Sequence, residues 1–316
     1  MSIQAVKPQP VAVSRMTLKS ITKGKQDSPI RALIYAPEGI GKSTFAASAP
    51  KPIFLTPEEG TMHLDVERFP TPQSWPEIIE AIKTLREQPH DYQTLVLDTL
   101  DHAEPMLWAY ICKRDAKKDI EDYGYGKGYV AALDEWRILI ALLEKLEKEK
   151  GMNILLLAHS WIRPFKSPEL EAFDRYELKL NAKAAGLIKE WVHAALFANY
   201  ETAIKKDGQK RARGIDTGSR LLHTQWTAAY DAKNRYSLRE TLPLDWTEFD
   251  NAVHAGQVAD PDALAAEIER KAKQLGGQME VKTLASLLKV RSDTQKMAIL
   301  NNWVNVKLTE KESKND

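Results

Sequence analysis

The stretch that decides the fold runs from Arg31 to Thr44 and has the sequence RALIYAPEGIGKST. Its first six residues are mainly apolar and favour a buried β-strand, and the residues from Lys42 onward have the composition of a helix. Between them lies PEGIG, a short loop with two glycines. A strand, a glycine-containing loop and a helix in this order bring backbone N–H groups together around phosphate oxygens.

This order predicts a phosphate-binding loop, or P-loop. Ala36 stands six residues before the lysine, where a first glycine is usual, and alanine is the smallest side chain that could replace it. Lys42 is expected to reach the β- and γ-phosphates, and the Ser43 hydroxyl to bind Mg²⁺. The alternative is a Gly-Lys-Ser sequence that occurs in a loop by chance. The predicted nucleotide-binding residues are Pro37, Glu38, Gly39, Ile40, Gly41, Lys42, Ser43 and Thr44.

Polar residues at the ends of other apolar strands could complete this site. Asp98 ends TLVLD and is expected to bind Mg²⁺ with Ser43, because ligands bind at the carboxyl ends of parallel strands. Glu58 and Glu59 end the second strand, where one carboxylate could orient the attacking water. His159 ends LLLAHS and could sense the γ-phosphate. Ordinary strand-end, solvated or backbone-bonded residues remain the alternatives.

The chain as a whole indicates an α/β protein with a mainly parallel sheet flanked by helices. Continuous apolar strands at 52–56, 92–100 and 152–160 are separated by helical patterns at 75–88 and 134–151. No guanine-reading NKxD motif is present, which favours ATP as the nucleotide. The expected domains are a flexible arm at 1–28, the ATPase core at 29–244, and a linker (about 245–260) with a helical C-terminal region within 245–316.

Bulk composition limits the functional classes. A net charge of +1 means that any nucleic-acid contact must come from local basic patches. One such patch is the basic segment around Asp207-Gly208, which has the signature of a β-hairpin. One cysteine and no apolar run of membrane-spanning length predict a cytoplasmic protein without disulfides or membrane contact. The histidines outside the motifs are too dispersed in sequence to predict a metal site beyond Mg²⁺. They are His63, His90, His102, His193, His223 and His254.

The motifs in this order resemble the RecA-like ATPase core, and more closely the phage-encoded AAA-domain ATPases of single-strand annealing or recombination type, related to RadA. The resemblance covers roughly residues 28–242. It rests on APEGIGKST, FLTPEEG, LVLDTLDH, YGYGKGY, ILLLAHS and AKNRY.

The resemblance implies roles for several residues. The catalytic glutamate falls on Glu58, although Glu59 occupies a place where relatives have glycine, so the assignment is open by one residue. His159 falls where RecA has a sensing glutamine. Lys233 and Arg235 of AKNRY are implied to contact a nucleotide held by a neighbouring subunit, which requires a ring or a filament. A solvated basic loop is the alternative for that segment.

In RecA-like proteins two loops inside the assembly bind single-stranded DNA, and they fall here on about 105–130 and 161–182. Cations that face phosphates and rings that stack on bases suit such binding, but both segments also contain acids, so mixed-charge solvated loops remain the alternative. The predicted DNA-binding residues are Lys113, Arg114, Tyr125, Lys127, Arg163, Phe165 and Lys166.

These observations predict an ATP- and Mg²⁺-dependent, oligomeric ATPase that acts on single-stranded DNA in recombination or annealing, with a single-strand DNA-binding protein as a conceivable partner. The alternatives are a helicase loader or motor on the same core, and a nucleotide-gated scaffold with little turnover.

Overall fold

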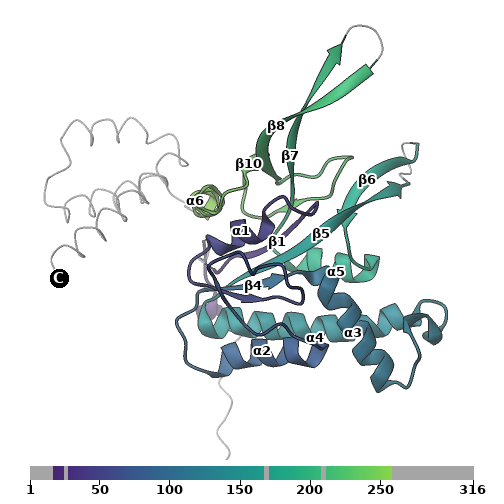
Figure 1. The fold of residues 1–316 in the computed structure, drawn as a ribbon. Coiled ribbons are helices and arrows are strands. Elements are labelled where there is room, and N and C mark those ends of the chain that lie inside the picture. Colours follow the sequence, from purple (N-terminus) through teal and green to yellow (C-terminus); the bar gives the residue numbers. More distant parts are fainter. Residues whose placement is uncertain (1–16, 25–27, 167–170, 208–210, 258–316) are drawn as a thin grey trace, which may run out of the picture.

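The computed structural model describes residues 17–24, 28–166, 171–207 and 211–257 of the chain (Figure 1). Most of the predicted N-terminal arm and all of the helical patterns beyond 260 lie outside the described residues. Gly208 and Lys210 of the predicted basic hairpin turn also lie outside them. A short 3₁₀ turn, η1 (Leu18–Ser20), precedes the core.

The described residues form one ten-stranded sheet in which the main strand order is β10-β8-β7-β1-β5-β4-β2-β3. The pairs from β3 to β7 are parallel, and the pairs β7–β8 and β8–β10 are antiparallel. Two further strands are antiparallel neighbours, β6 of β5 and β9 of β7. The strands are β1 (Arg31–Ala36), β2 (Pro52–Leu55), β3 (Glu67–Arg68), β4 (Thr94–Asp98), β5 (Asn153–Phe165), β6 (Phe173–Leu178), β7 (Ala194–Asp207), β8 (Arg211–His223), β9 (Lys233–Asn234) and β10 (Thr241–Pro243).

Helices cover both faces of the sheet. Helices α2 to α5 pack on one face, and α1 and α6 lie against the other (Figure 1). The helices are α1 (Lys42–Ala47), α2 (Trp75–Glu87), α3 (Leu100–Arg114), the 3₁₀ helix η2 (Ile120–Tyr123), α4 (Lys127–Lys150), α5 (Ala182–Trp191) and α6 (Trp246–Gln257). No helix within the described ranges is long and apolar enough to cross a membrane.

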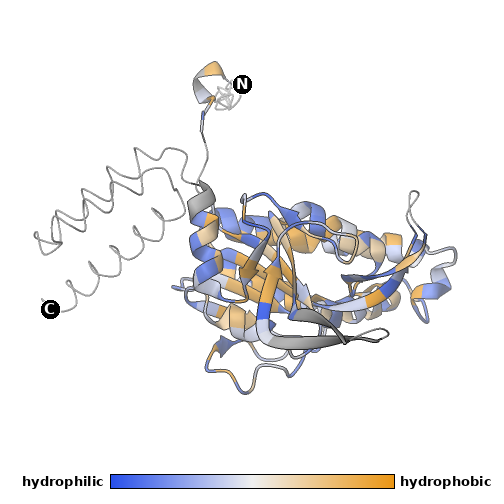
Figure 2. Cartoon of the chain, turned by 90° about the horizontal axis from the view of Figure 1, so that it is seen from above, coloured by the Kyte–Doolittle hydropathy of each residue, from blue (hydrophilic) through white to orange (hydrophobic). Residues whose placement is uncertain are grey.

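The central strands are apolar on both sides because both faces are covered. In β1, Leu33 and Tyr35 belong to the core beneath α2 to α5, whereas Ala32 and Ile34 belong to the core on the α1 and α6 side. Figure 2 shows the same pattern, with hydrophobic residues concentrated in the strands between the helical layers. The absence of alternation in RALIYA is therefore the sequence signature of a central strand.

Strand order brings the predicted motifs to one edge of the sheet. β5 lies between β1 and β4, and its His159 is in register with Ala36 of β1, while Asp98 of β4 is in register with Leu157. The P-loop, Asp98 and His159 therefore follow neighbouring strands at their carboxyl ends. This mainly parallel sheet with helices on both faces confirms the predicted RecA-like P-loop fold.

The linker expected at about 245–260 is wrong over its described part. Residues 246–257 form α6, and Trp246, Phe249 and Val253 are buried against the core. The Asp245 carboxylate accepts a hydrogen bond from the backbone N–H of Glu248, as an N-cap does. Apolar residues at spacings of three and four form the stripe that docks this helix.

Candidate functional site

The two glycines of the P-loop have left-handed backbone conformations. Gly39 and Gly41 have positive φ angles of 75° and 105°, and Gly41 is the N-cap of α1. Ala36, by contrast, is the buried last residue of β1 and has ordinary strand geometry. An alanine at the usual first-glycine position therefore costs nothing here, because left-handed backbone is needed only at Gly39 and Gly41.

Lys42 is the buried cation of this loop. Its side chain is buried, and its Nζ donates a hydrogen bond to the carbonyl oxygen of Pro37 at 3.3 Å. Burial lowers the pKa of this ammonium, and the nearby carboxylates of Asp98, Asp101 and Glu58 oppose that shift. A buried ammonium with one neutral partner is suited to a polyanion, which would supply the charge compensation that burial removes.

Ser43 and Asp98 form the closest contact between the loop and the rest of the site. The Ser43 hydroxyl donates a hydrogen bond of 2.5 Å to the Asp98 Oδ2. Burial raises the pKa of Asp98, the bond from Ser43 lowers it, and the charge of Glu58 raises it further. Hydroxyl and carboxylate oxygens are the ligands that Mg²⁺ prefers, so these two side chains fit the ion that P-loop proteins hold with a nucleotide.

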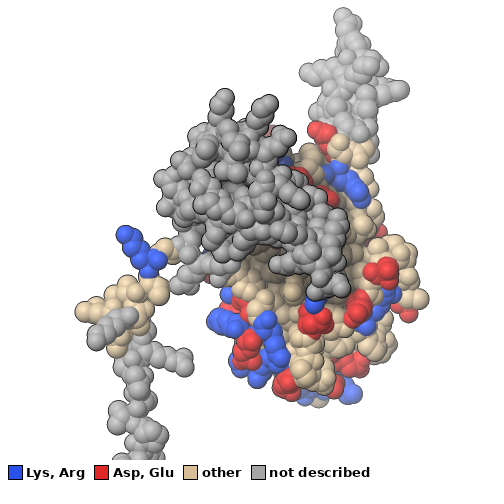
Figure 3. Space-filling model, turned by 90° about the vertical axis from the view of Figure 1, so that its left-hand side faces the viewer, with Lys and Arg blue, Asp and Glu red and all other residues tan. Residues whose placement is uncertain are grey.

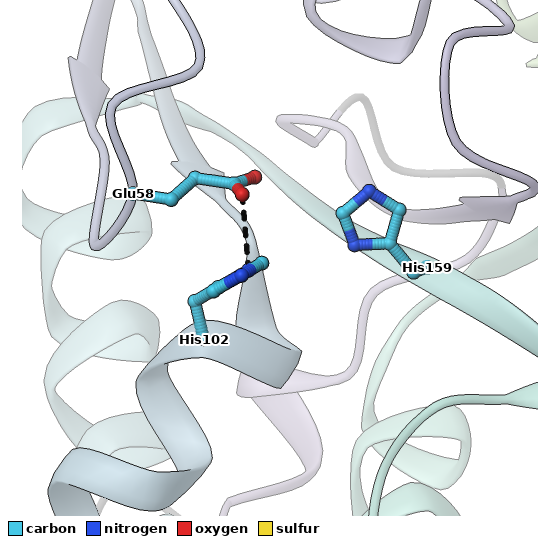
Figure 4. A group of neighbouring side chains, drawn as sticks. All are labelled: Glu58, His102 and His159. Carbon is cyan, nitrogen blue, oxygen red and sulfur yellow. Dashed lines mark ion pairs between the residues drawn. The ribbon is translucent and has the colours of Figure 1, made fainter.

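A second group of polar side chains lies next to this pair (Figure 4). The His102 Nδ1 is 3.2 Å from the Glu58 Oε2, and the Thr99 Oγ1 is 2.9 Å from the same nitrogen. His102 and His159 are edge-to-face neighbours, with 5.8 Å between their ring centroids. Glu58 contacts this group, whereas Glu59 is exposed, so geometry favours Glu58 as the carboxylate that faces the site.

Asp101, in the first turn of α3, holds His159 in place. One carboxylate oxygen accepts from the His159 backbone N–H at 2.9 Å, and the other lies 2.9 Å from its Nδ1. Burial alone would raise the pKa of Asp101, but the hydrogen bonds from His159 hold it at about 2. The carboxylate therefore stays ionised, accepts the Nδ1 proton and leaves Nε2 as the unprotonated ring nitrogen.

His102 and Asp101 were not predicted as members of the site. His102 was set aside in the sequence as too dispersed from the other histidines for a metal site beyond Mg²⁺, but the fold brings it next to Glu58 and His159. Glu58, His102 and His159 each place one possible ligand atom within 4.8 Å of the others. They come together because α3 begins directly after β4, so LDTLDH places Asp101 and His102 beside Asp98. That adjacency was the available signal.

Two residues that sequence reasoning missed contact the P-loop from the β7–β8 pair. The Arg220 Nη1 donates a hydrogen bond to the carbonyl oxygen of Ile40 at 3.0 Å, and the Tyr200 hydroxyl lies 3.5 Å from the carbonyl oxygen of Gly39. A Cβ on Gly41 would lie 2.6 Å from the Arg220 Nη1, so a larger residue would displace this guanidinium, while the φ of 105° favours glycine in any case. No sequence motif marks these two residues, because only the sheet register brings β8 to the loop.

The two cations of AKNRY lie at the other end of the sheet. Lys233 donates to the carbonyl oxygens of Lys189 and Glu190, at 2.8 and 2.6 Å, and so caps the end of α5. Arg235 is exposed, and its backbone N–H bonds the carbonyl oxygen of His193 beside the start of β1. The whole of β1, six residues that each rise about 3.3 Å, separates this end of the sheet from the P-loop. Arg235 therefore cannot reach the loop of its own chain.

The first predicted DNA-binding segment is more structured than a pliable loop. Lys113 and Arg114 are in the last turn of α3, and Lys127 is the first residue of α4. Arg114 pairs with Asp115 at 2.7 Å and with Glu135 at 2.8 Å, so its charge is already neutralised. Tyr125 is fully exposed between two positive-φ glycines, as expected for a ring presented to solvent.

The second predicted loop is a β-hairpin, formed by β5 and β6. Arg163 lies over the Trp161 ring at 3.5 Å, and Arg175 over the Phe165 ring at 4.7 Å. These cation–π pairs follow from the interleaving of basic and aromatic residues on paired strands. Lys166 is exposed at the end of β5. On the face that Figure 3 shows, acidic and basic side chains are interspersed and do not form a single-sign patch.

Comparison with known proteins places this site in a family. A search of curated proteins found no match. The crystal structure of the RadB recombinase is similar at 12% sequence identity and a TM-score of 0.37, over 62% of this chain and 80% of that chain. A likeness of that degree says nothing about activity. The AAA domain model matches residues 28–236. Since this range holds the P-loop, Asp98 and His159 and spans well over half of the chain, the protein belongs to the AAA domain family of P-loop proteins.

Proposed function

We propose that this protein binds ATP with Mg²⁺, hydrolyses it at a site completed by a neighbouring subunit, and acts on single-stranded DNA in recombination or strand annealing. The observation that carries the proposal is the Ser43–Asp98 hydrogen bond of 2.5 Å beside the buried Lys42. A hydroxyl, a carboxylate and an ammonium at the mouth of a glycine-containing loop are what a Mg²⁺-bound triphosphate requires.

Different residues would bind the phosphates and the Mg²⁺ ion. The loop from Pro37 to Thr44 would offer its N–H groups to the phosphates, and Lys42 would reach the β- and γ-phosphates. Ser43 and Asp98 would hold Mg²⁺, which when bound neutralises charge on the phosphate oxygens. The buried, ionisable state of Asp98 and the oxygen-only donor pair support this ion over a softer metal.

Hydrolysis needs a group that orients water, and Glu58 is the best candidate. Its carboxylate is next to His102 and close enough to Asp98 and Lys42 to influence the pKa of both. In this role Glu58 would accept the proton of the attacking water. His159, oriented by Asp101, would lie beside the γ-phosphate as the sensing residue. These assignments refine the sequence-based expectation of Glu58 over Glu59.

Oligomerisation follows from the position of Arg235. Its side chain is exposed at the end of the sheet opposite its own P-loop, so any nucleotide that it contacts belongs to another subunit, which supports a shared site. Lys233, which caps α5, is better explained as a structural residue. An arginine supplied by a neighbour would stabilise the charge that develops during phosphoryl transfer.

For DNA, the best-supported candidates are the exposed side chains of the α3–α4 segment and of the β5–β6 hairpin. Lys113, Tyr125 and Lys127 are exposed on the first, and Arg163 and Lys166 on the second. Both lie on the right-hand side of Figure 1. The resemblance to phage annealing proteins supports a role in recombination, and the folded core is proposed to extend through α6 to residue 257.

The experiment is an ATPase and annealing assay on the full chain with single-stranded DNA. Wild-type protein should hydrolyse ATP, with faster turnover when DNA is present, and should anneal complementary strands. Its DNA affinity should fall steeply with salt, because phosphate contacts release counterions. Duplex unwinding without annealing would favour the motor class, and ATP binding without turnover would favour a scaffold. A flat salt response would remove DNA from the proposal.

A further inference from the structure

We propose that Glu58, His102 and His159 form a second cation site, selective for a transition metal of the Zn²⁺ class and distinct from the Mg²⁺ pair Ser43–Asp98. The three residues come from three elements: the segment after β2, the first turn of α3 and β5. Their possible ligand atoms lie within 4.8 Å of one another (Figure 4). Two imidazoles and one carboxylate are the donor set of three-ligand zinc sites with an open fourth position.

The donor atoms separate this site from the magnesium pair. Mg²⁺ prefers oxygen ligands in octahedral geometry and keeps several waters, whereas imidazole nitrogens favour Zn²⁺, Co²⁺ and related ions. Ser43 and Asp98 offer oxygen only, and they are already joined by a 2.5 Å hydrogen bond. The Ser43–Asp98 pair and the three residues Glu58, His102 and His159 are therefore suited to different cations although they lie side by side.

The surroundings of His159 have the outer shell of a metal-binding histidine. Asp101, whose side chain is 3% exposed, accepts from the Nδ1 and from the backbone N–H of His159, both at 2.9 Å. A carboxylate in this place fixes the ring orientation, sets the tautomer that leaves Nε2 free and makes that nitrogen more basic. Thr99 also contacts His102: its Oγ1 is 2.9 Å from the Nδ1, the nitrogen that lies 3.2 Å from the Glu58 Oε2, and this contact helps to fix the ring orientation.

Access and charge also suit a cation. The side chains of His102 and Glu58 are 42% and 27% exposed, so an ion can enter from solvent, while His159 forms the buried base of the site at 11%. Glu58 and Asp101 supply two negative charges, one as a ligand and one behind a ligand. Two cations offset part of that charge: Lys179, whose Nζ is 3.8 Å from the Asp101 Oδ2, and the buried Lys42, on which Glu58 and Asp101 both act electrostatically.

Occupancy of this site has a consequence that rests on the proposed function. A carboxylate that ligates a metal ion cannot also accept a proton from water. Binding of a Zn²⁺-class ion would therefore withdraw Glu58 from its proposed role and slow ATP hydrolysis. The same ion would leave the Ser43–Asp98 pair and Lys42 free to bind Mg²⁺ and nucleotide, so inhibition should appear in turnover and not in ATP affinity.

The test uses nucleotide-free, tag-free full-length protein and Co²⁺ alone. Titration should produce a visible ligand-field band that saturates at one Co²⁺ per chain, that Zn²⁺ abolishes and that excess Mg²⁺ leaves in place. Glu58→Gln and His102→Ala should weaken binding by more than the roughly 10–100-fold that loss of an outer-shell partner costs, and Asp101→Asn by about that amount. Circular dichroism would establish that each variant is folded.

The matched controls are Glu59→Gln and His63→Ala, two exposed residues of the same segment, and both should bind Co²⁺ as wild type does. A missing band, or equal affinity in wild type, Glu58→Gln and His102→Ala, would overturn the site. Because no nucleotide is present, this result is independent of the proposed ATPase. A Co²⁺ site without any Zn²⁺ effect on turnover would keep the metal site and contradict only its inhibitory role.

Discussion

The guanidinium of Arg220 donates a hydrogen bond to the carbonyl oxygen of Ile40 at 3.0 Å, across 180 positions of sequence. This bond fixes the peptide between Ile40 and Gly41. Gly41 is the N-cap of α1, and its carbonyl oxygen accepts a hydrogen bond from the backbone N–H of Phe45. It also places a positive charge beside a loop built for anions. The antiparallel extension of the sheet thus contacts the P-loop directly, through a side chain of β8.

Arg220→Ala should weaken ATP binding, because the loop loses both a charged hydrogen-bond donor and a nearby cation. A hydrogen bond to a charged group contributes roughly 1.5–3 kcal/mol, which corresponds to a loss of about 10–100-fold in affinity. Calorimetric titration with ATP and Mg²⁺ measures it. Arg239→Ala is the matched control, since Arg239 is an exposed arginine that pairs with Glu248 at 3.5 Å away from the loop. Equal losses of ATP affinity in both variants would show that this affinity depends on overall charge and not on the Ile40 contact.

Arg235→Ala should abolish hydrolysis while ATP binding persists, because the arginine serves the neighbouring subunit. Loss of an arginine finger costs about 10³-fold or more in turnover. Mixing Arg235→Ala with Lys42→Ala chains should restore part of the activity, since some interfaces then combine an intact loop with an intact arginine. Steady-state ATPase rates across mixing ratios give the answer, and no recovery at any ratio would argue against a shared site.

Glu104→Gln should change how stability depends on pH. Burial raises the pKa of Glu104 to about 7, although hydrogen bonds from the Asn181 N–H oppose the shift. The folded state therefore holds this proton more tightly than the unfolded state, and the stabilisation present below pH 4.5 is lost as pH rises through about 7.

Wild type should thus lose stability relative to Glu104→Gln between these pH values, by an amount on the order of 3 kcal/mol. Urea denaturation of both proteins at pH 4.5 and 8 measures the difference. Burial lowers the pKa of His193 to about 4, but this residue is present in both proteins, so its contribution cancels in the comparison. A difference that stays constant with pH would show that Glu104 keeps its ordinary pKa.

Trp246→Ala should destabilise the core, because α6 is part of it. The indole is 5% exposed and makes edge-to-face contacts with Phe45 of α1 and with Phe249, at 5.6 and 5.7 Å between centroids. Truncation of a buried tryptophan costs about 3–5 kcal/mol, whereas Thr247→Ala on the exposed side of the same turn should change stability by less than about 0.5 kcal/mol. Denaturant melts compare the two, and a neutral Trp246→Ala would contradict the packing of α6.

Short sequence patterns predicted the structural features that a short stretch of chain determines. Apolar runs identified the buried strands, and RALIYAPEGIGKST predicted the strand, the glycine-containing loop and the helix that begins at Lys42, because such a turn is determined within a dozen residues. The end of TLVLD predicted the partner of Ser43, since parallel strands place their carboxyl ends at one edge. The P-loop and Asp98 could thus be predicted without the structure.

Register and long-range packing could not be predicted in this way. Arg220 reaches Ile40 only through the pairing of β7 with β1 and of β8 with β7, and no pattern in residues 194–223 specifies that register. The segment at 161–182 was expected to be a loop because the resemblance to RecA-like proteins places a DNA-binding loop after the strand that ends in His159. Strand pairing and stacking of Arg175 on Phe165 instead stabilise a hairpin. Tertiary contacts override local preference in both cases.

The central claim is that Lys42, Ser43 and Asp98 hold Mg²⁺-bound ATP, and calorimetric titration of the full chain with ATP tests it most directly. We expect one ATP per chain in the presence of Mg²⁺, weaker binding when EDTA removes the ion, and binding reduced by about 10²–10³-fold in Lys42→Ala. ATP binding that is equal in wild type and Lys42→Ala, or no binding by folded wild-type protein, would contradict it.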